Sequence, residues 1–104
     1  RYAAGILESC GFGVAPLADP GVALSAADLA PWVEAMSELE HGRWSVDRLA
    51  DGWRLGPRDN SRKVHDCLVP WSELPDDIRE WDRRAIRNYP DIFASVGLKI
   101  VKRG

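Results

Sequence analysis

Apolar residues recur at helical spacing in two separate stretches of the chain. In the first stretch they predict a long helix over residues 27–49, whose apolar face comprises Leu29, Trp32, Met36, Leu39, Val46 and Ala50. In the second they predict a helix that begins at residues 72–75, ends near residue 89 and is stopped by Pro90; its face comprises Ile78, Trp81, Asp82, Ala85, Ile86 and Tyr89. The pattern therefore predicts two long amphipathic helices.

Shorter elements are predicted before, between and after these helices. The flanking elements are the end of a helix over 2–10, a strand over 12–17, a short helix over 91–96 and a terminal strand over 98–101. Between the long helices, two extended pieces over 53–55 and 68–71 border a turn-rich loop over 56–62. We expect a mainly α fold with short β-strands (α+β), in which two long helices flank an irregular, short-strand segment.

The first long helix carries a start signal and two unusual positions. Ser25 and Asp28 have the spacing of a helix cap. Gly42 lies mid-helix, where it costs about 1 kcal/mol relative to Ala, so it either admits another backbone or marks a kink. Arg43 falls on the apolar face, as Asp82 does on the second helix. A lone buried charge is costly. We therefore hypothesise that Arg43 and Asp82 form an ion pair, that each pairs with another nearby residue, or that each extends its charged group to solvent at the edge of the apolar face.

The length and net charge of the chain indicate how many domains it holds and which partners it is suited to bind. With 104 residues the chain is one domain's worth, and a net charge of −2 does not predict binding to DNA or RNA. The two cysteines lack the spacing of a metal site and suit a reducing compartment, so we expect a cytoplasmic protein without a metal. No apolar run approaches the roughly 20 residues of a membrane span. Because the first residue is Arg1, we expect the chain to be a piece of a larger protein.

Charge is nevertheless concentrated in one segment. Residues 54–63 hold four cations (Arg54, Arg58, Arg62, Lys63) and one anion (Asp59), a local charge of +3, and tryptophans flank them. Indole faces beside fixed guanidinium groups suit a planar, anionic ligand such as a nucleotide. We take as candidate ligand-binding residues His41, Trp44, Trp53, Arg54, Arg58, Asp59, Lys63, His65 and Trp71. The same residues also suit the anchor points of a protein-docking surface.

Several motifs, in order along the chain, resemble those of the RyR domain, the repeat first seen in ryanodine receptor calcium channels. They are Glu40-His41-Gly42-Arg43-Trp44, Gly52-Trp53-x-x-Gly56-Pro57-x-Asp59, Lys63-x-His65, Leu68-Val69-Pro70-Trp71-x-x-Leu74, Glu80-x-Asp82-Arg83, and Pro90 followed by Gly97-Leu98-x-Ile100. The resemblance covers residues 29–103. It departs at Leu55, where the family usually has an aromatic residue, and at Asp66, where it has a proline.

The resemblance implies a single-copy, bacterial-type RyR domain over residues 29–104. Residues 1–28 would be a lead-in segment or the tail of an upstream domain. Similar copies joined to nucleotide-binding domains, like those of potassium-uptake regulators, suggest an accessory sensor whose partners include other domains of its parent chain. We therefore expect a module without catalytic residues or cofactor that binds a small anionic, nucleotide-like ligand, with protein docking as the alternative and an enzyme as the least favoured reading.

Overall fold

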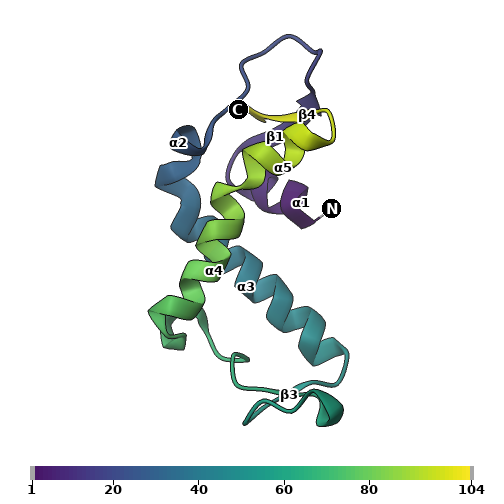
Figure 1. Cartoon of the computed structure of the whole chain (residues 1–104), viewed down its shortest axis with the longest axis vertical. Coiled ribbons are helices and arrows are strands. Elements are labelled where there is room, and N and C mark those ends of the chain that lie inside the picture. Colours follow the sequence, from purple (N-terminus) through teal and green to yellow (C-terminus); the bar gives the residue numbers. More distant parts are fainter. Residues whose placement is uncertain (1, 104) are drawn as a thin grey trace.

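The computed structural model describes residues 2–103 as an elongated body of 48 × 24 × 23 Å (Figure 1). Two helices, α3 (Val33–Ala50) and α4 (Asp76–Arg87), run along the body and pack against each other. A small sheet lies at one end and the segment that connects α3 to α4, residues 51–75, forms the other. The mainly α fold with short strands is confirmed.

The sheet end joins the beginning of the described chain to its end. Helix α1 (Tyr2–Ser9) leads into β1 (Phe12–Pro16), which pairs antiparallel with β4 (Leu98–Lys102), so that Phe12 lies opposite Lys102. Both strands were predicted from their apolar residues. The following loop is fastened to this sheet, because the Leu24 N–H donates to the carbonyl of Ile100 at 2.9 Å. The ammonium of Lys99, 5% exposed, donates to the carbonyls of Asp19 and Gly21 in the same loop.

The first long helix is interrupted near its start. Ser25 and Asp28 form the predicted capping box on α2 (Ala26–Leu29), but a 3-10 turn, η1 (Ala30–Trp32), separates α2 from α3. Pro31 explains the interruption, since it lacks the N–H that a continuous α-helix would use. Helix α3 runs through Gly42, and a Cβ built at Gly42 meets no atom within 4 Å. Close approach of another backbone is therefore not the reason for this glycine.

The main core lies between α1, the sheet and the near halves of α3 and α4. Its buried members are Ile6, Leu7, Phe12, Leu29, Val33, Met36, Ile86, Tyr89 and Ile100. The predicted face of the first helix is thus only partly correct: Leu29 and Met36 are buried, whereas Trp32, Leu39 and Val46 are exposed. Val33 and His41 take the inward positions instead. The C-terminal end of α4, at the core, is followed by α5 (Tyr89–Ser95), in which Pro90 lies in the first turn.

The connecting segment contains two short strands and two 3-10 turns. Strand β2 (Arg54–Leu55) pairs in parallel with β3 (Val64–His65), and η2 (Asn60–Arg62) lies between them; η3 (Trp71–Glu73) precedes α4. The predicted extended piece at 68–71 is correct only in part: residues 68–70 lie outside any helix, Trp71 begins η3, and the partner of β2 lies four residues earlier. Lys63 adopts a left-handed conformation, φ 56°, between η2 and β3. No residue from 42 to 70 is buried, so this end depends on local contacts.

Candidate functional site

A pocket of about 390 Å³ lies between α3, α4 and the connecting segment. Its size falls in the roughly 300–1,000 Å³ range of small-ligand sites. We call it the α3–α4 pocket; the residues that line it are His41, Trp44, Arg58, His65, Asp66, Cys67, Pro75, Ile78, Trp81 and Asp82. Four of the nine predicted binding residues, His41, Trp44, Arg58 and His65, are among them.

Aromatic rings build the α3 side of this pocket. The ring of Trp44 is stacked on that of His41, with centroids 5.7 Å apart, and meets the edge of His65 at 4.9 Å. Arg48 lies over the rings of both Trp44 and Trp53, at 5.6 and 5.0 Å from their centroids. These contacts hold the indole of Trp44 in place and leave it at the pocket wall. A fixed aromatic face of this kind suits a planar ligand.

The two histidines have fixed hydrogen-bonding roles. The Nε2 of His41 lies 2.7 Å from the carbonyl of Val69, which requires that Nε2 carry a proton and donate it. The Nδ1 of His65 accepts from the backbone N–H of Cys67 at 3.0 Å. Burial lowers the pKa of His65, and the positive charge of Arg58 lowers it further. His65 is therefore a neutral ring that braces the connecting segment.

The four cations of residues 54–63 do not converge. Lys63 pairs with Asp51 and donates to its carbonyl, and Arg62 pairs with Asp59, whose carboxylate also caps η2. Arg54 is exposed on β2 and does not line the pocket. Arg58 alone reaches the pocket, and its guanidinium has no hydrogen-bond or ion-pair partner among residues 2–103. The structure thus brings one cation to the site.

Asp82 and Arg43 are placed differently from the hypothesis that joined them. Arg43 pairs with Glu40 and with Asp47 in its own helix. Asp82 lies on the wall of the α3–α4 pocket instead, half-buried. Burial raises the pKa of its carboxyl, the nearby His41 lowers it and Glu40 raises it. The direct pair is replaced by local partners for Arg43, because residues three and four apart on a helix meet directly.

Comparison with a protein-family model identifies the family of this chain. The model of the RyR domain matches residues 15–102, which is most of the chain. The chain belongs to the RyR domain family. The match starts inside β1, so it includes all of β4 but only the last two residues of β1, and it begins earlier than the resemblance over 29–103.

Two tryptophans of the predicted site lie outside the pocket of this RyR domain. Trp71 is buried, and its indole N–H donates to the carboxylate of Glu34 at 3.0 Å. Arg83 donates to the same carboxylate, which lowers the pKa of Glu34. Trp53 lies beside His65, with ring centroids 6.2 Å apart, under Arg48. Trp71 is therefore a packing residue, and Trp53 supports the ring that does line the pocket.

Sequence reasoning missed Trp81 as a pocket residue. It was assigned to the apolar face of the second helix, yet 67% of its surface is exposed. The sequence carried one signal: the carboxylate of Asp82 directly follows Trp81, and a charged group on the predicted apolar face indicates that this face is not wholly buried.

A histidine, an acid and a thiol come together at residues 65–67. His65, Asp66 and Cys67 place ligand atoms within 4.8 Å of one another, but the Nδ1 of His65 is already used by the Cys67 N–H. Burial raises the pKa of the Cys67 thiol, so this sulfur is not activated as a nucleophile.

Within residues 2–103, no helix has both the length and the apolarity to cross a membrane.

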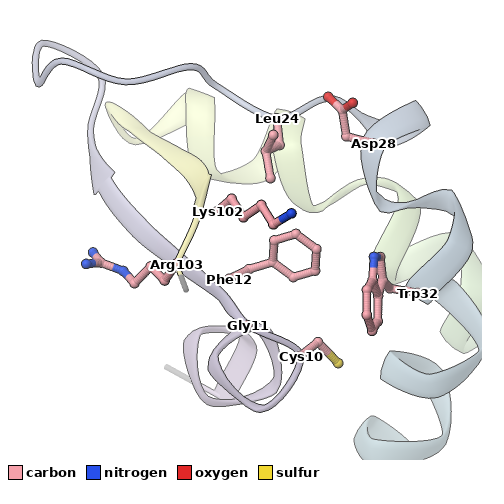
Figure 2. A pocket seen from close by; sticks show the side chains of 8 residues that line it. All are labelled: Cys10, Gly11, Phe12, Leu24, Asp28, Trp32, Lys102 and Arg103. Carbon is pink, nitrogen blue, oxygen red and sulfur yellow. The ribbon is translucent and has the colours of Figure 1, made fainter.

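A second pocket of about 460 Å³ lies at the sheet end (Figure 2). Phe12 and Trp32 meet edge to face there, with centroids 5.7 Å apart. Its two cations do not converge: Figure 2 shows Arg103 turned away from Trp32, and its guanidinium donates to the carbonyl of Val14. Asp28 is used in the capping box. This pocket therefore matches the predicted chemistry less well than the α3–α4 pocket.

Proposed function

We propose that this RyR domain is a non-enzymatic sensor module that binds a nucleotide-like small molecule in the α3–α4 pocket. The observation that carries the proposal is that Arg58, a cation without a partner in the described chain, lines the same pocket as the indoles of Trp44 and Trp81. Stacking of a base on an aromatic side chain contributes roughly 1–3 kcal/mol. A guanidinium can hold a phosphate through two hydrogen bonds.

The charge of the pocket fixes how such a ligand lies. Arg58 is the only cationic lysine or arginine among the lining residues, and Asp66 and Asp82 are acidic. A polyanionic ligand is therefore disfavoured. The ring of the ligand lies against the tryptophans, and one anionic group extends to Arg58. Such a module would report ligand binding to other domains of a cytoplasmic parent protein, in keeping with the copies joined to nucleotide-binding domains like those of potassium-uptake regulators.

Arg58→Ala tests this function, with Arg54→Ala as the matched control. Both arginines are exposed and belong to the connecting segment, but only Arg58 lines the pocket. Nucleoside monophosphates are titrated by calorimetry. Arg58→Ala should weaken binding more than tenfold, a loss of at least about 1.4 kcal/mol, without changing the unfolding of the free protein. Equal affinities of the two variants, or no binding by the unmodified chain, would refute the proposal.

Protein docking is the second candidate function, and an exposed apolar stripe favours it. Trp32, Leu39 and Val46 are seven residues apart and exposed, with Leu49 beside them. Seven-residue spacing places them on one side of the helical rod. A contiguous row of exposed apolar side chains is a common feature of protein-interaction surfaces. If the stripe binds a partner, Val46→Glu should abolish capture of that partner and leave nucleotide binding unchanged; loss of both would exclude separate sites.

A further inference from the structure

The carboxylate of Asp82 is unusual among the acidic groups of α4. Asp76 and Glu80 each pair with an arginine, Arg83 or Arg87, and Asp77 is exposed to solvent. Asp82 is half-buried in the pocket wall and has no hydrogen-bond or ion-pair partner within residues 2–103. A carboxylate has room for about four hydrogen bonds. Among the described acids of this helix, Asp82 is therefore the one that is both shielded in a pocket and left with open acceptors.

Two donors near Asp82, those of His41 and Arg83, are already engaged, and the remaining pocket cation, Arg58, does not pair with it. His41, on the same pocket wall, gives its Nε2 proton to the carbonyl of Val69. The guanidinium of Arg83 is held by Glu34 and Asp76. A ring that stacks on Trp44 or Trp81 removes water from this carboxylate. It must then bring its own N–H donors, because an unsatisfied carboxylate in a covered site opposes binding.

The nucleobases differ in the donors that they offer. Guanine presents two adjacent N–H donors, N1–H and the 2-amino group, which match the two oxygens of a carboxylate. Adenine presents one donor and one acceptor, and the lone pair of the acceptor repels a carboxylate. Hypoxanthine keeps N1–H but lacks the 2-amino group. Bidentate recognition of this kind discriminates a base by about 1–3 kcal/mol.

We propose that Asp82 makes the α3–α4 pocket selective for a guanine nucleotide, with the guanine edge on Asp82 and the phosphate at Arg58. The inference rests on the proposed function and adds the identity of the base. Arg58 also argues against a purely cationic ligand for the same carboxylate, because its own positive charge faces the pocket. A guanine nucleotide satisfies both groups, since it carries donors at one end and an anion at the other.

Calorimetric titration with GMP, IMP and AMP tests the selectivity on the unmodified chain. GMP should bind at least tenfold more tightly than AMP, with IMP between them, because each step removes or reverses one hydrogen bond to Asp82. If none of the three nucleotides binds, the proposed function itself fails. If GMP and AMP bind equally well, the domain is a nucleotide module without base selectivity, and the role of Asp82 is overturned.

Two variants then assign the selectivity to one carboxylate. Asp82→Asn should reduce GMP affinity at least tenfold and bring it close to that of AMP. Asp77→Asn is the matched control, since Asp77 lies on the same helix but is exposed and does not line the pocket; it should keep the preference for GMP. A preference that survives in Asp82→Asn, or disappears in Asp77→Asn, would refute the assignment. The comparison of GMP, IMP and AMP on the unmodified chain remains decisive if Asp82→Asn fails to fold.

Discussion

Replacing Trp71 or Trp81 by alanine should have very different effects on stability, because the two indoles lie in opposite environments. Trp71 is 9% exposed, and its indole N–H donates to Glu34, whereas Trp81 is 67% exposed on the pocket wall. Trp71→Ala removes roughly 200 Å² of buried surface, which at about 25 cal/mol per Å² corresponds to about 5 kcal/mol. Measured losses for such truncations are about 3–5 kcal/mol, and we expect that range here.

Trp81→Ala should leave stability nearly unchanged. A substitution at an exposed position usually alters the free energy of unfolding by no more than about 0.5 kcal/mol. For a chain of this size, a loss of 3 kcal/mol lowers the melting temperature by at least about 12 °C, so the two variants are readily separated. Trp71→Phe keeps a ring but loses the N–H donor to Glu34, and we expect an intermediate loss of about 1–3 kcal/mol.

Urea unfolding followed by far-ultraviolet circular dichroism measures these differences without relying on the fluorescence of the remaining tryptophans. The slope of the free energy with urea should be the same for all three variants if the folded and unfolded states are unchanged. A loss below about 1 kcal/mol for Trp71→Ala would show that the Glu34–Trp71 contact does not hold the connecting segment. A large loss for Trp81→Ala would show that its indole is covered by the protein.

Three further outcomes are expected. The pKa of Asp82 in the folded protein is raised above its ordinary value of 3.8, so Asp82 contributes to stability below pH 3.8 and this contribution is lost as the pH rises through the folded pKa. Urea unfolding at several pH values should therefore show Asp82→Asn gaining stability relative to the unmodified chain as the pH rises from 3.8 through the folded pKa. The folded pKa of His65 is lowered, so stability should fall as the pH decreases from 6.5 toward that value, and an NMR titration should place its imidazole below 6.5. Met36→Ala should cost about 2–5 kcal/mol in thermal unfolding, because Met36 is fully buried.

The sequence predicted the elements better than it predicted which faces they bury. Residues 12–16 and 98–102 have apolar patterns that indicate strands, but the pattern of either strand says nothing of a partner more than 80 residues away. In the first helix, Pro31 shifts the phase at its start. The inward face therefore follows Val33, Ser37 and His41, whereas the spacing alone favoured Trp32, Leu39 and Val46.

The candidate site was predicted by segment and only partly by residue. The crowding of tryptophans and cations indicated the connecting segment, and His41, Trp44, Arg58 and His65 do meet in one pocket. The cations Lys63 and Arg62 are instead used by Asp51 and Asp59, which spacing could not show, because a neighbouring acid satisfies a charge only in a particular backbone geometry. Trp81 and Asp82 enter the pocket because α4 packs against α3, and a single sequence does not specify that packing.

Figure 1 shows α1 and the end of β4 in the same half of the domain, while the α3–α4 pocket lies toward the other half. Helices α3 and α4 run between the two halves, so a change in the pocket has a direct structural route to the β1–β4 sheet. A small change in the angle between α3 and α4 at the pocket would then displace the strands of the β1–β4 sheet.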